Sequence, residues 1–428
     1  MKKVILYKIL YWLSQLILHK YKPDIIGITG SVGKTSTKEA IFTVLKNSIS
    51  VRQSAKNYNN ELGVPLTILG SESASNSWWG WFIIIMRALF LWLQKNPQYP
   101  HVLVLEMGAD HIGDIEYLVN MAPCKVGVLT AVSESHLEFF GDLATVAKEK
   151  GMIISHLADS NWAIINRDNE MAWQQRSRTK AQVISYGIKK QADFRASDIN
   201  ISWRQGKIGL SFKLSYQGTI LPIFVPEIIS EQQVYALLAA AAIGIIYDMN
   251  LVEIGQALQD YHGIAGRTRW LPGIKNTQVI DDTYNSSPLA AEAALELLVK
   301  IDFLSEKEKG RRWAILGDML ELGDQSEVAH RTLGHKVAEL GIDYLVSFGE
   351  RARDIARGAK EAGMLDDYIF TFSDHDRAGH FIQNKIKEND IILIKGSQGV
   401  RMEKLVKEIM AEPQRANELL VRQTKEWQ

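Results

Sequence analysis

One stretch near the amino terminus, residues 24–37 with the sequence DIIGITGSVGKTST, constrains the fold of this chain more than any other. Residues 25–28 form a short apolar run with the composition of a buried strand. Two glycines, Gly30 and Gly33, follow in a loop, and residues 36–45 then carry apolar side chains at helical spacing. Such a loop binds phosphate, because its glycines let backbone N–H groups approach the oxygens and the helix amino terminus favours an anion. The stretch therefore predicts a nucleotide phosphate site.

Side chains of the same loop add to this predicted site. Lys34 would neutralise phosphate charge, and the hydroxyl of Thr35 would ligate Mg²⁺. The strict G-x-x-x-x-G-K-[ST] pattern is not met, because Ile28 stands at the position of its first glycine, so the loop is a shorter variant. The candidate nucleotide-binding residues of the loop are Gly30, Ser31, Gly33, Lys34, Thr35 and Ser36.

The overall composition limits the class of protein and its compartment. A chain of 428 residues suits two or three domains. Lys and Arg number 49 and Asp and Glu also number 49, so no basic field points to nucleic acid. The single cysteine, Cys124, cannot form an intrachain disulfide and fits a reducing compartment. We therefore expect a cytoplasmic protein without a nucleic-acid partner.

Two apolar segments raise the question of membrane contact. Residues 2–22 mix apolar residues with lysines, as a basic amphipathic helix on a membrane surface does, and predict an amino-terminal helix over residues 1–23. Residues 78–93, WWGWFIIIMRALFLWL, are more apolar but are shorter than the roughly 20 residues of a spanning helix and contain Arg87. No spanning segment is expected. Two interpretations stay open for both segments: peripheral contact with the inner face of the membrane, or packing against the protein body or a partner chain.

Most of the chain alternates strand-like and helix-like stretches, which is typical of a parallel sheet covered by helices. Apolar runs at residues 101–105, 125–131 and 162–166 read as buried strands, and residues 193–225 alternate polar and apolar side chains as antiparallel strands do. Five more strand candidates lie between residues 278 and 395, separated by helical stretches. The predicted fold class is α/β: a P-loop ATPase central domain with a mostly parallel sheet and a small antiparallel part, followed by a Rossmann-like carboxyl-terminal domain.

The expected domain boundary lies where glycine and proline accumulate. Residues 261–273 contain four glycines or prolines and two arginines. We therefore place a central domain at residues 24–265, with an apolar insertion at 71–100, and a carboxyl-terminal domain at 266–428.

Three polar residues of the central domain are candidates for chemistry. Glu106 ends a predicted strand and suits a Mg²⁺ ligand, although a carboxylate at a strand end is common. His136 follows the next strand and could ligate a metal or act as a general base, or be an ordinary surface histidine. Lys150 lies on the helix after that strand, where a solvated lysine is the simpler interpretation.

Three loops of the carboxyl-terminal domain also follow strands. In the first, Asp282 could accept from ribose hydroxyls and Tyr284 could pack on a base, or the loop could merely begin a helix before Pro288. The other two, residues 316–323 and 395–399, are either turns or substrate-facing loops. Arg267 could bind phosphate, or could tie down the linker.

Taken in order, these stretches resemble the Mur ligase family of ATP-dependent amide-forming enzymes. The resemblance extends from about residue 24 to the carboxyl terminus. It implies that a substrate carboxylate attacks the γ-phosphate of ATP to give an acyl phosphate, which an amine then converts to an amide. The matching segments are TGSVGKTSTKE (29–39), NYNNELGVPLTIL (57–69), EMGADHIGDI (106–115), HLEFFGDLATVAKEKG (136–151), DDTYNSSP (281–288), LGDMLELGDQSEVAH (316–330) and IKGSQGVRMEKLV (394–406).

The resemblance also implies roles for the central-domain candidates. Lys34 would contact the β- and γ-phosphates, while Thr35 and Glu106 would hold one Mg²⁺ ion. His136 would help to hold a second ion, and Lys150 matches the position of the family's carbamylated lysine, whose added carboxylate assists metal binding. The implied catalytic residues are thus Lys34, Glu106, His136 and Lys150, and the implied metal ligands are Thr35, Glu106, His136 and Lys150.

Five further nucleotide contacts follow from the resemblance. They are Asn166 and Asn169 near the adenine, Asp282 and Tyr284 at the ribose and base, and Arg267 at a phosphate. Such an arrangement requires domain closure over ATP, so residues 261–273 are the predicted hinge.

The last three matching segments most resemble the branch that adds D-alanyl-D-alanine to a UDP-MurNAc-peptide in peptidoglycan synthesis. That branch carries an amino-terminal domain that grips the UDP-sugar, which is expected to be lacking here, since only about twenty residues precede the phosphate-loop strand. We expect a monomer that acts on these small molecules with ATP and two Mg²⁺ ions. A Mur-like ligase for a different acid, and a non-catalytic nucleotide-binding module of a membrane complex, remain as alternatives.

Overall fold

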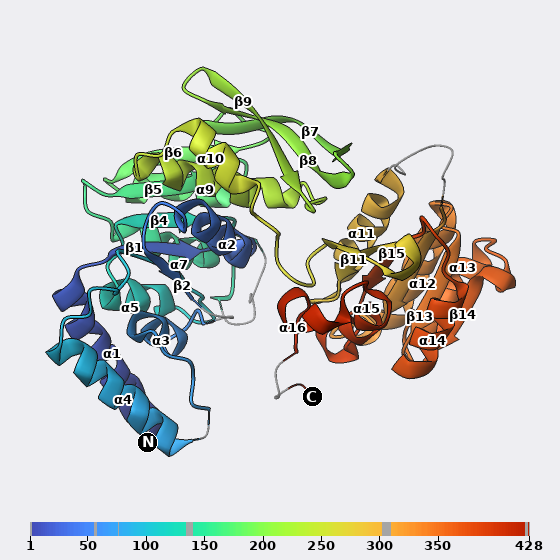
Figure 1. Cartoon of the computed structure of the whole chain (residues 1–428), viewed down its shortest axis with the longest axis horizontal. Coiled ribbons are helices and arrows are strands. Elements are labelled where there is room, and N and C mark those ends of the chain that lie inside the picture. Colours follow the sequence, from blue (N-terminus) through green and yellow to red (C-terminus); the bar gives the residue numbers. More distant parts are fainter. Residues whose placement is uncertain are drawn as a thin grey trace. The chain divides into compact units, whose positions relative to one another are not determined.

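The computed structural model describes residues 2–54, 58–75, 77–133, 140–301, 310–423 and 427. It divides into two compact units. The first comprises residues 1–200, 211–225 and 231–261, and the second comprises residues 201–210, 226–230 and 262–428. Each unit is built on its own sheet, and Figure 1 labels the helices and strands.

The sheet of nine strands has the order β2-β3-β1-β4-β5-β6-β7-β8-β9 and belongs to the first unit, apart from residues 201–210 and Pro226. The pairs from β2 to β7 are parallel. Two-residue turns at 205–206 and 217–218, with positive φ throughout, then join β7, β8 and β9 as antiparallel hairpins. The strands are β1 (Asp24–Thr29), β2 (Val51–Gln53), β3 (Val102–Glu106), β4 (Val126–Leu129), β5 (Trp162–Asn166), β6 (Gln182–Gly187), β7 (Phe194–Arg204), β8 (Lys207–Tyr216) and β9 (Thr219–Pro226).

Two groups of helices cover this sheet. One group consists of α2 (Lys34–Leu45), α9 (Gln232–Ile246) and α10 (Leu251–Leu258), which pack on one another. The other shares one apolar core and consists of α1 (Lys2–Tyr21), α3 (Gly63–Leu69), α4 (Trp78–Leu93), α5 (Asp114–Met121), α7 (Leu143–Ser155) and α8 (Glu170–Gln174). Strands buried on both faces explain the nearly continuous apolar runs of the sequence.

The second unit contains a sheet of six strands in the order β10-β11-β15-β12-β13-β14. Helices α11 (Pro288–Lys300), α12 (Ser326–Glu339) and α13 (Arg353–Glu361) share one core with it. Helices α14 (His375–Lys385), α15 (Glu403–Ile409) and α16 (Ala416–Leu419) share another. The strands are β10 (Arg269–Pro272), β11 (Gln278–Asp282), β12 (Arg312–Gly317), β13 (Tyr344–Phe348), β14 (Ile369–Phe372) and β15 (Ile391–Lys395), and all pairs except β10–β11 are parallel.

The predicted fold class is confirmed, but one local prediction is wrong. Residues 261–273 were expected to be a linker, whereas residues 269–272 form β10 and pair antiparallel with β11. Because β10 is the edge strand of its sheet, Pro272 is tolerated there in spite of its missing N–H. A hinge in this part of the chain is therefore confined to the residues before Arg269.

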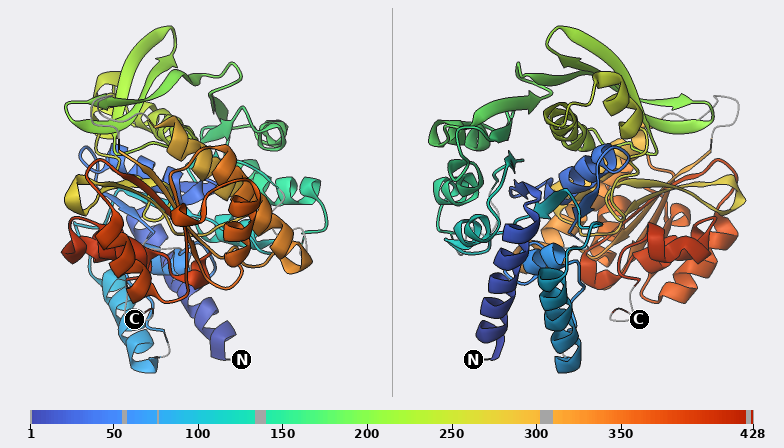
Figure 2. Two further views of the ribbon diagram at one scale, coloured as in Figure 1. Left: turned by 90° about the vertical axis from the view of Figure 1, so that its right-hand side faces the viewer. Right: turned by 60° about the vertical axis from the view of Figure 1, so that its left-hand side comes forward.

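The two apolar segments of the sequence form α1 and α4, which pack on each other (Figure 2). No helix in the described part of the chain is long and apolar enough to cross a membrane. The expectation of packing against the protein body holds for one face of each helix: Leu10, Leu13 and Ile17 of α1 are buried, and so are Ile84 and Ala88 of α4.

Candidate functional site

The phosphate loop lies between the end of β1 and the start of α2. Gly30 has φ 150°, and a Cβ atom at this position would lie 2.0 Å from the Thr130 hydroxyl, so only glycine fits. Gly33 has φ 87° and is the N-cap residue of α2. The loop is tied to the segment after β4, because the Ser31 backbone N–H donates to the Ala131 carbonyl at 2.6 Å. These contacts fix the backbone that was predicted to hold phosphate.

The first turn of α2 supplies the remaining residues of the loop. Lys34, Thr35 and Ser36 occupy it, and its N-cap residue, Gly33, has no side chain that could cap the backbone N–H groups. Uncapped first-turn N–H groups, with the positive end of the helix dipole, favour an anion at this position. The Lys34 ammonium group donates to the Gly30 carbonyl at 2.7 Å, which places its charge over the loop.

Glu106 ends β3 beside the start of the phosphate loop, since it pairs in register with Ile28 of β1. Its side chain is buried, and its Oε1 accepts from the Asn59 amide at 3.2 Å. Its Oε2 is also buried and has no hydrogen-bond partner among the described residues. A buried carboxylate oxygen without a partner is costly, so Glu106 fits a Mg²⁺ ligand better than a purely structural acid.

Lys150 of α7 lies next to this loop in space. Its side chain is only 2% exposed, which excludes the simpler alternative of a solvated lysine. Burial, and after it the positive charge of Lys34, lower the pKa of Lys150 to about 8. The structure thus brings together two lysines that are more than a hundred residues apart in the sequence. An amine with this pKa is partly neutral near neutral pH, which makes it a nucleophile.

The segment after β3 is tied to α7 by Glu149, a residue that the sequence motifs did not single out. Both carboxylate oxygens of Glu149 accept backbone N–H groups, from Ile115 at 2.8 Å and from Gly113 at 3.0 Å. Asp110 in the same segment raises the pKa of Lys150, against the effect of burial. The segment lies within the family motif EMGADHIGDI, but 34 residues separate Glu149 from Ile115, so no local pattern reveals the contact.

The predicted second metal site is described only in part. His136 lies outside the described residues. Among the residues that are described, no group of three or more His, Cys, Asp or Glu side chains could hold a metal ion. The described candidates for ligands are therefore Thr35 and Glu106, with Lys150 nearby.

Of the two residues predicted near the adenine, Asn166 is the last residue of β5 and Asn169 lies in the loop that follows it. Asn166 is buried, and its side-chain oxygen accepts from the Asp168 N–H at 3.0 Å. The Asn169 amide pairs with both backbone groups of Val132, at 3.1 and 3.0 Å, and also caps α8. Asn169 therefore holds the loops after β4 and β5 together.

In the second unit, the predicted ribose and base residues lie at the end of β11. Asp282 accepts from the Thr268 N–H at 3.0 Å and forms a 2.6 Å ion pair with the buried Lys395 of β15. The Arg267 guanidinium lies over the Tyr284 ring, 4.3 Å from its centroid. Arg267, Asp282 and Tyr284 are thus brought together within one small region.

A serine joins the three strand-end loops predicted for this unit. The Ser397 hydroxyl accepts from the Leu320 N–H at 2.9 Å and donates to the Ser286 carbonyl at 3.3 Å. The loops after β11, β12 and β15 therefore meet at one edge, as expected for the carboxyl ends of neighbouring parallel strands.

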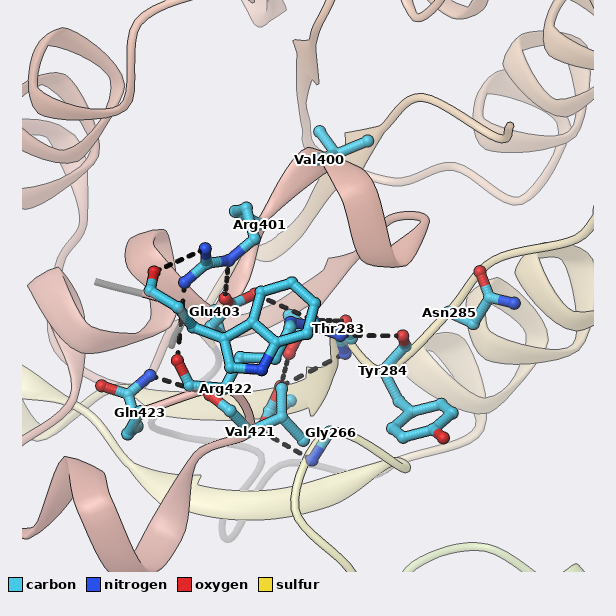
Figure 3. A network of polar contacts seen from close by, with 12 residues as sticks. Gly266, Thr283, Tyr284, Asn285, Val400, Arg401, Glu403, Val421, Arg422 and Gln423 are labelled. Carbon is cyan, nitrogen blue, oxygen red and sulfur yellow. Dashed lines mark hydrogen bonds and ion pairs between the residues drawn. The ribbon is translucent and has the colours of Figure 1, made fainter. Parts of the chain in front are cut away.

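A buried charge network supports the first of these loops (Figure 3). Arg422 donates to the backbone carbonyls of Thr283 and Tyr284, and it pairs with Glu403 at 2.8 Å. Glu403 is completely buried and also pairs with Arg401. The sequence analysis missed this network, because its members lie in stretches without a recognisable local pattern.

Two family models match the chain. The Mur ligase middle domain matches residues 28–77 and 88–244, and the Mur ligase glutamate ligase domain matches residues 266–398. The break between residues 77 and 88 falls within α4.

Curated relatives and solved structures agree with these matches. The UDP-N-acetylmuramoyl-tripeptide–D-alanyl-D-alanine ligases of Bacillus subtilis and Escherichia coli are each 28% identical, over 94% and 90% of this chain and 79% and 76% of their own lengths. MurF from Acinetobacter baumannii superposes with a TM-score of 0.76 at 25% identity, over 93% of this chain and 79% of its own. MurF from Thermotoga maritima in complex with ADP superposes with a TM-score of 0.71 at 25% identity, over 94% of this chain and 83% of its own. With both domain models matched in order, the chain belongs to the Mur ligase family.

Proposed function

We propose that this protein is an ATP-dependent, ADP-forming ligase that joins D-alanyl-D-alanine to the carboxylate of a UDP-MurNAc-peptide. The observation that carries the proposal is the grouping of a phosphate loop, a buried acid with an unpartnered oxygen and a buried lysine of lowered pKa. A protein that only binds nucleotide has no need of that lysine. The names of the relatives support the choice of acid and amine.

In the proposed reaction, a carboxylate oxygen of the acid attacks the γ-phosphorus of ATP, and ADP leaves. The amine nitrogen then attacks the carbonyl carbon of the acyl phosphate, and phosphate leaves as the amide forms. Phosphoryl transfer of this kind depends on positioning and on neutralising charge. Lys34 and the N–H groups of Gly30, Gly33 and Ser36 would bind the β- and γ-phosphates, and Ser31, whose N–H donates to the Ala131 carbonyl, would hold the loop in position for them.

We assign Mg²⁺ to Thr35 and Glu106, because the buried Oε2 of Glu106 lacks a partner in the described structure. Bound Mg²⁺ would offset the negative charge of the phosphates. A second ion is proposed at His136 and at Lys150 in its carbamylated form. The neutral Lys150 amine would attack CO₂ through its nitrogen and release a proton, which leaves a carbamate oxygen as a ligand.

In the second unit, Asp282 and Tyr284 are proposed to contact the ribose and base, and Arg267 a phosphate. Asn166 and Asn169 are proposed near the adenine. Lys395 and Arg422 would act as positioning residues: Lys395 orients the Asp282 carboxylate, and Arg422 holds the backbone at Tyr284. We propose a cytoplasmic monomer, which agrees with a single cysteine, Cys124, that is free and buried.

The test is phosphate release from ATP by the purified protein. It is given UDP-MurNAc-tripeptide and D-alanyl-D-alanine, with each component also omitted in turn. We expect release only when both are present, and we expect the amide product by mass spectrometry. Retained ATP binding without stimulation by this pair would refute the substrates and would turn the search to another acid. A second set of reactions with Lys34→Met should lose the stimulated release.

A further inference from the structure

The helices α1 and α4 carry an unusual concentration of exposed apolar side chains. Of the 22 large apolar side chains exposed in the described part of the chain, 11 lie on these helices of 20 and 16 residues. We call them the α1–α4 surface. They are Ile5, Ile9, Trp12, Trp78, Trp79, Phe82, Ile83, Met86, Phe90, Trp92 and Leu93. Exposed apolar clusters of this kind mark interaction sites in soluble proteins.

Loose attachment of the helices does not explain why these side chains are exposed. On α4, residues 79, 82, 86, 90 and 93 recur at helical spacing on the exposed side, while Ile84 and Ala88 are buried. On α1, Ile5, Ile9 and Trp12 are exposed, while the opposite side enters the core of the first unit. Each helix thus has two apolar faces, of which the fold covers only one.

The two helices run in the same direction and end together. The Lys20 ammonium group donates to the carbonyls of Leu91 and Trp92, and the Tyr21 hydroxyl donates to those of Leu91 and Gln94. Their amino-terminal ends therefore lie at the same far end, and in Figure 2 they extend side by side away from the sheet of the first unit. Trp78 and Trp79 stand at this end, with 68% and 58% of their surface exposed.

The charges on the two helices are of one sign. Neither helix contains an acidic residue, whereas their sequences include Lys2, Lys3, Lys8, Lys20 and Arg87. The amino termini of both helices add partial positive charge. Tryptophan is the side chain most suited to the boundary between lipid headgroups and acyl chains, because its ring is apolar and its N–H is polar.

From this geometry we propose that the α1–α4 surface docks the protein on a bilayer that contains anionic phospholipids. The aromatic side chains enter the headgroup boundary, and the exposed Lys8 contacts a lipid phosphate. The helices do not cross the bilayer, because α4 has only 16 residues and α1 is interrupted by lysine. This inference is independent of the proposed ligase activity, since it rests on residues outside the phosphate loop and its neighbours.

The experiment is flotation of the full chain with vesicles of phosphatidylcholine, with and without phosphatidylglycerol, at low and high salt. We expect the protein to float with the anionic vesicles and to be released by salt. The triple variant W78S, W79S and F82S should lose binding at least about tenfold, because burying one large apolar side chain can supply that factor. Lys8→Gln should weaken binding about fivefold. The control variant, V328S with L365S, removes two exposed apolar side chains of the second unit and should float like the parent.

Three outcomes would overturn the proposal. One is a parent protein that stays at the bottom of the gradient with every vesicle. Another is a triple variant that floats as well as the parent. The third is a parent that forms a dimer without lipid and does not float, while the triple variant is monomeric, since a second copy would then cover this surface. An unchanged melting temperature of the triple variant in vesicle-free buffer confirms that it is folded.

Discussion

The environment of Lys150 leads to a quantitative prediction about its chemistry. At pH 7 an amine with a pKa of about 8 is roughly one-tenth neutral, whereas one at the ordinary value of 10.5 is neutral to about three parts in ten thousand. The structure therefore raises the reactive fraction of this lysine about 300-fold. Because only the neutral amine attacks CO₂, Lys150 should carbamylate far more readily than an exposed lysine.

The assay is ¹³C NMR of the protein equilibrated with ¹³C-bicarbonate, in parallel with phosphate release. We expect a carbamate signal that grows as the pH rises from 7 to 8, since the neutral fraction grows through the pKa of Lys150. Lys150→Met keeps most of the aliphatic stem and should remove both the signal and the turnover, while nucleotide binding persists. Lys148→Met is the matched control, because Lys148 lies on the same helix and is exposed.

Three results would refute this reasoning. They are the absence of a carbamate signal in the parent at pH 8, a signal that persists in the Lys150→Met variant, and normal turnover by that variant. The last result would also remove the proposed second metal site.

Three other predictions concern buried charges. Burial raises the pKa of Asp281 from 3.8 to about 6, so the contribution of this group to stability is complete below pH 3.8 and is lost as the pH rises through 6. In urea unfolding, the free energy of unfolding of Asp281→Asn should lack up to about 3 kcal/mol of this pH dependence. Equal pH profiles of the variant and the parent would contradict the prediction. Arg422→Met leaves the buried Glu403 with one partner fewer, so the free energy of unfolding should fall by about 3 kcal/mol and the KM for ATP should rise. An unchanged melting temperature would argue against this prediction. Glu106→Gln should raise the Mg²⁺ requirement of phosphate release at least about tenfold without loss of stability, and an unchanged Mg²⁺ titration would exclude Glu106 as a ligand.

Local patterns were sufficient for the phosphate loop and for the order of elements. Gly30 and Gly33 are required by the backbone angles of the loop itself, so their spacing is visible in the sequence. The alternation of buried strands and helices follows from the periodicity of apolar residues, which depends only on near neighbours. The prediction failed at residues 269–272, because the pairing of β10 with β11 as an edge strand outweighed the loop-forming tendency of glycine and proline.

Only the tertiary structure decided which residues have unusual environments. The sequence could not distinguish the buried Lys150 from the exposed Lys148, since burial depends on elements that arrive from elsewhere in the chain. The support of Tyr284 by Arg422 likewise joins residues 138 positions apart. The apolar character of α1 and α4 was evident from composition, but which face of each helix the core covers depends on packing. Periodicity and the glycine spacing therefore determined the fold class and the predicted phosphate loop, while long-range packing determined the pKa of Lys150, the charge network and the exposed apolar surface.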